Sequence, residues 1–224
     1  MLHTLSTNSY KNGSWKFNCL PNRDARRKIR RNTYPLPSFE GITPSAIKKE
    51  EDFPSVQCFK KGFEFLDTNK DADNWFLQIE TFDPHEPFFA PEKFKEKYKT
   101  NYKGPILDWP RYSRVTESQN EIDELRANYF ALLSLCDHLL GEVLDYFDKN
   151  NLWEDTALIC ATDHGFLLGE HDWWAKNRMP LYEEISHIPL FIYHPEYKNK
   201  IGESRNSLTQ TMDLMPTFLD FYGL

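Results

Sequence analysis

An apolar run that ends abruptly in an acid and a histidine constrains the fold of this chain most. Residues 157–161, Ala-Leu-Ile-Cys-Ala, are small or apolar without alternation, which is typical of a central strand of a parallel sheet covered on both faces. Asp163, His164 and Gly165 follow. Neighbouring strand residues point to opposite faces, so Asp163 and His164 reach one ion only if the chain turns, which Gly165 permits. Open α/β sheets bind ligands at this end of a strand.

Four other segments predict regular structure. Residues 121–148 repeat apolar side chains at a spacing of three and four, which predicts a long helix with one buried stripe. Residues 74–82 and 188–193 are rich in apolar and aromatic residues and predict strands. Residues 209–224 predict a helix with Pro216 in its first turn. This order of helices and strands favours a parallel α/β architecture.

The domain organisation is predicted to be uneven. Residues 1–70 form a poorly defined amino-terminal segment, although residues 56–66 predict a short amphipathic helix. Residues 71–224 hold the predicted strands and long helix. Within them, residues 90–117 are polar and aromatic, interrupted by glycine and proline, and predict an excursion rather than core.

Charge and composition exclude several classes of function. The net charge of −7 disfavours general nucleic-acid binding, although a basic run spans residues 23–31. We interpret that run as a solvated arm or helix face, with phosphate or nucleic-acid binding as the alternative. No apolar run is long enough for a membrane span and no signal peptide is recognised, which leaves the compartment open. The four cysteines are widely spaced and predict buried free thiols.

His85 and Lys176 are the candidate catalytic residues. His85 lies between prolines at the end of a predicted strand, where the stiff backbone would hold it in place, and a histidine hydrogen-bonded to the loop backbone is the alternative. Lys176 lies on a loop that returns near the strand end, with a snorkelling surface lysine as the alternative. Beside a metal, these two residues can hold an anionic group or protonate a leaving oxygen.

Asp163 and His164 are the candidate metal ligands. Their oxygen and nitrogen atoms suit one divalent ion such as calcium, magnesium, manganese or zinc. Two ligands do not complete a site, and the chain shows no obvious Asp-Asp pair at another strand end. A second acid–histidine pair, Asp137 and His138, lies inside the predicted long helix, where adjacent residues diverge by about 100°, so we interpret it as structural or exposed.

Several motifs together resemble those of the sulfatase family. They lie in an order and at spacings that match the second half of the sulfatase catalytic domain, in the alkaline phosphatase superfamily. The resemblance is nearest to iduronate-sulfatase-like and phosphonate monoester hydrolase-like members, and it covers roughly residues 74–224. The matching segments are Pro-His-Glu-Pro-Phe at 84–88, Ala-Thr-Asp-His-Gly-Phe-Leu-Leu-Gly-Glu-His at 161–171, Trp-Ala-Lys at 174–176, Ile-Pro-Leu-Phe-Ile at 188–192 and Asp-Leu-Met-Pro-Thr-Phe-Leu at 213–219.

The resemblance implies a fold, a reaction and residue roles. The implied fold is a mostly parallel mixed sheet between helical layers, and the implied reaction is hydrolysis of a small anionic ester, with sulfated sugars among the candidate substrates. Asp163 and His164 match the family's late metal-ligand pair, for which calcium is expected first. Lys176 matches the lysine that contacts the sulfate or phosphate and the leaving oxygen. His85 matches the histidine that helps to bind the anion and protonate the leaving group.

The family's nucleophile is not identified in this chain. Sulfatases begin with an acidic metal-ligand pair and a C/S-x-P-x-R motif, whose cysteine matures to formylglycine. No acidic strand end precedes His85, but residues 19–23, Cys-Leu-Pro-Asn-Arg, fit the motif. We interpret Cys19 as a chance match because it lies too close to His85, no buried strand precedes it and the usual threonine-glycine continuation is missing.

Three interpretations of function follow. The first is a metal-dependent sulfuric ester hydrolase, of which this chain is an incomplete part that lacks the first strands and the carboxyl-terminal subdomain. The second, a phosphodiester or phosphonate monoester hydrolase, uses the same residues. The third is a catalytically inactive truncated fragment, which would leave a sheet edge and apolar surface exposed. The substrate and the oligomeric state stay open.

Overall fold

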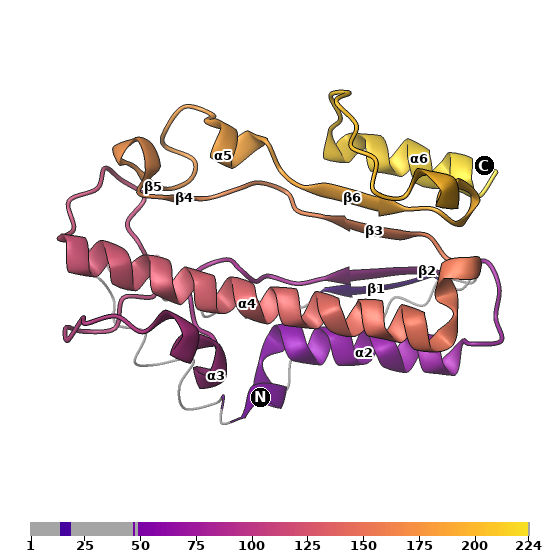
Figure 1. Ribbon diagram of the computed structural model, residues 1–224, viewed down its shortest axis with the longest axis horizontal. Coiled ribbons are helices and arrows are strands. Elements are labelled where there is room, and N and C mark those ends of the chain that lie inside the picture. Colours follow the sequence, from indigo (N-terminus) through magenta and orange to yellow (C-terminus); the bar gives the residue numbers. More distant parts are fainter. Residues whose placement is uncertain (1–13, 19–46, 48, 224) are drawn as a thin grey trace. The chain divides into compact units, whose positions relative to one another are not determined.

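The computed structural model describes the backbone of residues 14–18 and all of residues 47 and 49–223 (Figure 1). The chain divides into two compact units. The first unit comprises Met1–Glu142 and Leu168–Ala175, and the second comprises Val143–Leu167 and Lys176–Leu224. The domain boundary expected near residue 70 stays a prediction.

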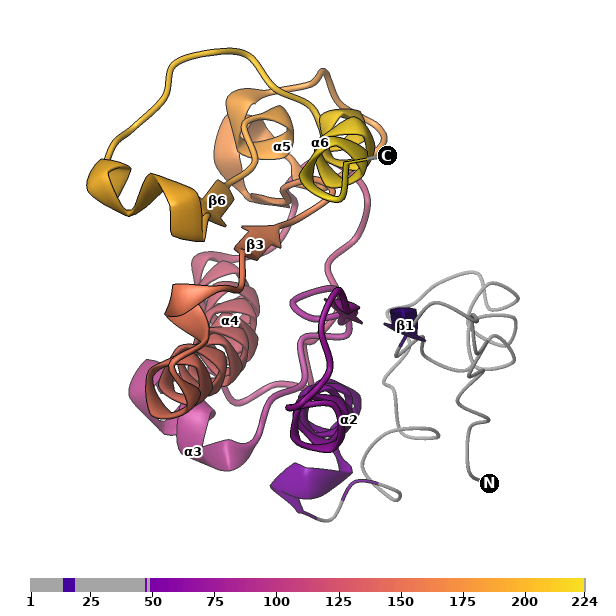
Figure 2. The same cartoon turned by 90° about the vertical axis from the view of Figure 1, so that its right-hand side faces the viewer.

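The first unit contains a pair of parallel strands beside a helix. Strand β1 (Ser14–Asn18) pairs in parallel with β2 (Phe76–Glu80), which confirms the strand expected over residues 74–82. Helix α2 (Pro54–Thr68) confirms the expected amphipathic helix and packs along this pair, as both views show (Figures 1 and 2). A Cβ atom at Gly62 would crowd the Ile79 side chain, so a glycine there lets the helix approach the strand closely.

The core of the first unit is built on helix α4 (Gln119–Asn150), which confirms the expected long helix. The predicted stripe is confirmed in part in this unit, because Leu125, Leu132 and Leu139 are buried. Leu133 was also expected in the stripe and is 42% exposed, whereas Ala131 and Leu135 are buried without having been predicted. Residues 90–117 were expected to lie outside the core, and this is wrong, because Phe94 and Leu107 are buried. These apolar residues stand between prolines and polar residues without any period, so the sequence pattern does not reveal their burial.

The second unit is built on an antiparallel pair of strands, contrary to expectation. Strands β3 (Leu158–Ala161) and β6 (Leu190–Tyr193) lie where they were expected, but they pair antiparallel. The expected burial of β3 on both faces is also wrong, because its first three residues are half-buried and Ala161 is exposed. In the described part of the chain β3 pairs with β6 alone.

Short elements complete the described chain. Helix α6 (Leu214–Phe221) confirms the expected last helix, with Pro216 in its first turn. No helix in the described residues is both long and apolar enough to cross a membrane. The remaining elements are helices α3 (Glu92–Lys95) and α5 (Glu183–Ser186), the paired strands β4 (Leu167–Leu168) and β5 (Trp174–Ala175), and 3₁₀ turns at Glu50–Asp52, Glu96–Tyr98, Leu152–Glu154, Glu170–Asp172, Pro195–Lys200 and Thr211–Asp213.

The buried stripe of α4 can be tested with two adjacent leucines. Leu132→Ala should lower the free energy of unfolding by about 2–5 kcal/mol, because this side chain is fully buried and its truncation leaves a cavity. Leu133→Ala is the control, since Leu133 is 42% exposed, and it should cost less than about 1 kcal/mol. Urea unfolding of both variants measures the difference. Equal losses would contradict the assigned face of the helix.

Candidate active site

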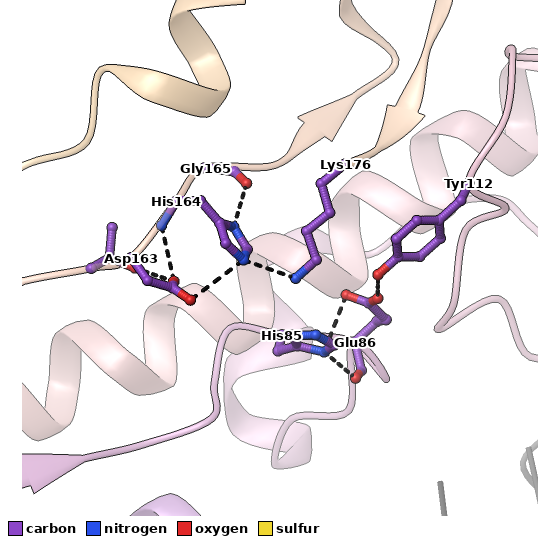
Figure 3. Close-up of polar contacts among 8 residues, drawn as sticks. His85, Glu86, Tyr112, Asp163, His164, Gly165 and Lys176 are labelled. Carbon is purple, nitrogen blue, oxygen red and sulfur yellow. Dashed lines mark hydrogen bonds and ion pairs between the residues drawn. The ribbon is translucent and has the colours of Figure 1, made fainter. Parts of the chain in front are cut away.

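The two candidate metal ligands follow β3 directly, as the sequence indicates, and their side chains approach each other (Figure 3). Asp163 Oδ1 accepts a hydrogen bond from the backbone N–H of His164 at 2.9 Å, and Asp163 Oδ2 lies 3.5 Å from His164 Nε2. The Asp163 side chain is 82% exposed, so its carboxylate is open to a ligand from solvent. The local chain therefore brings both predicted ligands to one place.

Lys176 and Gly165 together fix the proton arrangement of the His164 ring. Lys176 Nζ lies 3.2 Å from His164 Nε2, and because an ammonium group can only donate, Nε2 must be the acceptor. The ring proton then lies on Nδ1, which donates to the carbonyl oxygen of Gly165 at 2.9 Å. His164 thus presents a lone pair at Nε2, the form of histidine that also binds metal ions.

Asp163 and His164 fit part of a metal site. An oxygen and a nitrogen 3.5 Å apart can both reach an ion at the usual ligand distances of about 2.0–2.6 Å. Among the described residues, no group of three or more histidine, cysteine, aspartate or glutamate side chains is arranged to hold a metal. The two candidate ligands therefore do not form a complete set with other side chains of the described residues.

Lys176 is buried, so the alternative of a snorkelling surface lysine is wrong. Its exposed fraction is 7%, and Nζ also lies 5.9 Å from the centre of the Phe166 ring. The residues on either side, Ala175 and Asn177, have φ angles of 70° and 75°, in the left-handed region that L-residues seldom adopt. Such strain costs on the order of 1–3 kcal/mol and is found preferentially at functional sites.

Position 165 has no space for a side chain, so a glycine is required there. Its backbone N–H donates to Ile185 O at 2.9 Å, and a Cβ at Gly165 would overlap the carbonyl oxygen of Glu184. The segment that carries His164 is therefore held against the backbone of α5, within the second unit. The sequence indicated a glycine at this position for a turn, but it gave no sign of this close approach.

A methyl group at Gly165 should disturb the site. Gly165→Ala forces the segment away from Glu184 and should cost roughly 1–3 kcal/mol, while altering the ring signals of His164. Gly141→Ala is the control, because a Cβ at this helical position meets no atom within 4 Å and should stabilise by about 0.5–1 kcal/mol. Thermal unfolding and NMR spectra of the histidine rings measure both effects. A neutral Gly165→Ala variant with unchanged His164 signals would refute the assigned role.

His85 follows β2, and its ring proton is also fixed by a main-chain carbonyl group (Figure 3). His85 Nδ1 lies 2.7 Å from the carbonyl oxygen of Glu86, which can only accept, so Nδ1 carries a proton. The same Nδ1 lies 3.3 Å from Glu86 Oε2, and the ring centre lies 4.2 Å from that of Phe82. The hydrogen bond to the loop backbone that was considered as the alternative is thus present. The carboxylate of Glu86 also lies beside the ring, and a histidine that only stabilises a loop does not require it.

Glu86 and Tyr112 form a second polar group around His85 that the sequence did not reveal. Glu86 is 1% exposed, and its Oε1 accepts a hydrogen bond from the Tyr112 hydroxyl group. Burial, and then the hydrogen bond and charge of Glu86, raise the pKa of Tyr112 far above its ordinary value, so the hydroxyl stays a donor. In the sequence, the position of Glu86 between His85 and Pro87 is the one feature that could have pointed to a role for Glu86. No sequence feature pointed to Tyr112.

Asp83 is a further acid, half-buried, on the loop after β2. Burial raises the pKa of Asp83 to about 6, while a hydrogen bond from the Ser55 hydroxyl group opposes the rise. Burial also raises the pKa of the Cys136 thiol to about 12, with the charge of Asp83 adding to the effect. Cys136 is therefore a weakly reactive thiol. The three described cysteines are free, as expected, but only Cys58 is buried, and Cys136 and Cys160 are half-buried.

The half-buried acid Asp83 predicts a pH-dependent stability. Its pKa is higher in the folded chain than the value near 4 of an unfolded chain, so the folded state binds more protons between pH 4 and 6 and loses stability as the pH rises. Asp83→Asn removes that cost and should stabilise the protein at pH 7 by up to about 3 kcal/mol, with little effect at pH 4. Urea unfolding at both pH values measures this. Asp71→Asn, in an exposed turn, is the control, and a gain independent of pH would contradict the assignment.

Comparison with known proteins identifies the family. The sulfatase family model matches residues 4–224. The chain therefore belongs to the sulfatase family, a family of hydrolases in the alkaline phosphatase superfamily. This match begins well before the motifs at residues 74–224, so the family resemblance extends into the amino-terminal segment.

Two similar proteins are named as a member of the alkaline phosphatase superfamily and as a sulfatase. The chain is 26% identical to the multifunctional alkaline phosphatase superfamily protein PehA of Trinickia caryophylli, over 84% of this chain and 42% of that protein. It is 36% identical to the N-acetylglucosamine-6-O-sulfatase of Bacteroides thetaiotaomicron, over 60% of this chain and 24% of that protein. The chain thus spans less than half the length of these relatives.

A solved structure supports the α/β fold. The phosphonate monoester hydrolase SpPMH of Silicibacter pomeroyi superposes with a TM-score of 0.63 at 23% identity, over 89% of this chain and 46% of that one. This likeness shows a shared fold. In the described residues, the larger strand pairs are one parallel pair, β1–β2, and one antiparallel pair, β3–β6.

The possible nucleophile lies outside the described residues. Cys19 and the basic run at residues 23–31 belong to the part of the chain that is not described. Strand β1 ends at Asn18, however, so a strand does precede Cys19, and the sequence had given no sign of it. One argument against Cys19 is thereby weakened, while its interpretation as a chance match stays a prediction.

Proposed function

We propose that this chain is part of a metal-dependent sulfuric ester hydrolase. The observation that carries the proposal is the buried ammonium group of Lys176 beside His164 and Asp163. An ammonium group held in a buried, strained segment is costly unless it serves a purpose, and binding an anionic ester is such a purpose. Membership of the sulfatase family supports sulfate as that anion.

The residues would divide the work of ester cleavage. Lys176 would bind the sulfate group and stabilise the negative charge that grows on it during the reaction. His85 would protonate the departing oxygen, since its ring is held in a defined orientation by Glu86. Asp163 and His164 would hold part of a divalent ion, calcium before manganese, magnesium or zinc, and this ion would supply positive charge to the bound ester.

The complete domain would supply what the described residues lack. We expect it to form a mostly parallel mixed sheet between helical layers, to which residues 71–224 contribute the carboxyl-terminal part. It would also provide the remaining metal ligands and a formylglycine nucleophile, which is not identified in this chain. The substrate would be a small anionic ester, with sulfated sugars as one class.

Two alternatives have specific support. The similarity to SpPMH and to the multifunctional protein PehA favours a phosphodiester or phosphonate monoester hydrolase as the second candidate. A catalytically inactive truncated fragment is the third, because the chain spans 42% of PehA and 46% of SpPMH. Only turnover measurements separate the three.

Turnover by the 224-residue chain and by a longer version of the protein tests the proposal. A version extended upstream to the length of its relatives should hydrolyse aryl sulfates or sulfated sugars faster than phosphonate monoesters and phosphodiesters. Lys176→Ala in that version should lower kcat/KM by about 10²–10³-fold, because the cation that faces the anionic ester is lost. Lys198→Ala is the control, since this lysine is exposed and pairs with Glu154.

Each outcome selects one candidate. Preference for phosphorus esters would favour the second candidate. Turnover by the extended version but not by the 224-residue chain would favour the inactive fragment, and absence of turnover in both would contradict the proposed hydrolase activity. An unchanged rate in Lys176→Ala would remove the role of this residue.

A further inference from the structure

The carboxylate of Glu86 is buried in a way that demands a counter-charge. Its side chain has no exposed surface, and one of its oxygens, Oε1, accepts from the neutral hydroxyl of Tyr112. The other, Oε2, is buried and has no hydrogen-bond partner among the described residues. Burying a carboxylate costs free energy unless a donor or a positive charge compensates it. The imidazole of His85 is the group in a position to do so.

Two oxygen atoms of Glu86, its carbonyl oxygen and the carboxylate oxygen Oε2, face the same ring nitrogen of His85. His85 Nδ1 lies 2.7 Å from Glu86 O and 3.3 Å from Glu86 Oε2. The carbonyl oxygen keeps the proton on Nδ1, and the nearby negative charge favours a second proton on Nε2. Tyr112 approaches from the other side of the carboxylate and holds it in this orientation (Figure 3).

We propose that Glu86 is a positioning residue that keeps His85 doubly protonated and correctly oriented, and that Tyr112 holds Glu86 in place. A general acid must carry its proton before the leaving oxygen departs, and a buried carboxylate behind the ring supplies that condition. This inference rests on the proposed function, because it explains how His85 becomes the proton donor. It gives a purpose to two residues, Glu86 and Tyr112, that the sequence motifs leave without a role.

The inference can be tested in the chain itself without measuring turnover. Protein labelled with ¹⁵N in histidine is studied at pH 7 by long-range ¹H–¹⁵N NMR, and the His85 signals are assigned by their loss in His85→Gln. In the wild type both ring nitrogens should show protonated shifts. In Glu86→Gln, which keeps the size of the side chain but removes its charge, His85 Nε2 should move toward the unprotonated range. Glu96→Gln, an exposed acid-to-amide change in the same unit, should leave the His85 signals unchanged.

Tyr112→Phe tests the same chain of contacts and covers the case in which Glu86→Gln does not fold. It should shift His85 Nε2 in the same direction by a smaller amount, and it should add nothing in the Glu86→Gln background, because it acts through Glu86. Unchanged His85 signals in every folded variant of this pair would overturn the inference and leave Glu86 as a buried structural acid. If the signals shift as expected while the extended protein hydrolyses neither sulfate nor phosphorus esters, the proposed function fails and the assignment of Glu86 stands.

Discussion

One local contact, which the chain makes once in each unit, orients both candidate histidines. In both His85 and His164 the ring Nδ1 donates to the carbonyl oxygen of the next residue, at 2.7 Å and 2.9 Å. This contact fixes which ring nitrogen carries the first proton and how the ring is turned. Because it joins adjacent residues, it closes almost no loop and costs little conformational entropy. The chain can therefore set the direction of both rings before any long-range packing forms.

The two histidines differ in the charged group that each one meets. His164 Nε2 accepts from the buried ammonium of Lys176, which requires the neutral ring with a lone pair at that atom. His85 Nδ1 instead faces the buried carboxylate of Glu86, which favours a second proton on the ring. The same local hydrogen bond is thus combined with a cation at His164 and with a carboxylate at His85, which fits the ligand role proposed for one ring and the proton-donor role proposed for the other. Different environments that divide acid and ligand roles in this way are a general feature of hydrolytic sites.

The sequence predicted what depends on periodicity and composition. The stripe of α4, the positions of β2, β3 and β6, and the pairing of Asp163 with His164 all follow from local pattern. The direction of β6 did not, because an apolar strand reads alike in either direction and the chain turns back between residues 162 and 189. The contact of Gly165 with α5 and that of Tyr112 with Glu86 join segments 19 or more residues apart, and no short motif records such contacts.

The contacts of the candidate site residues differ in sequence separation. The contacts that orient the rings span one residue, and the contact between Lys176 and His164 spans 12. Local and medium-range contacts of this kind need only the segments that carry them. A divalent ion needs more ligands than Asp163 and His164 supply, and the family resemblance places the others on strands far upstream in the sequence. The hydrogen bonds that orient the two rings are thus made between adjacent residues, whereas the described residues contain no group of three or more side chains arranged to hold a metal.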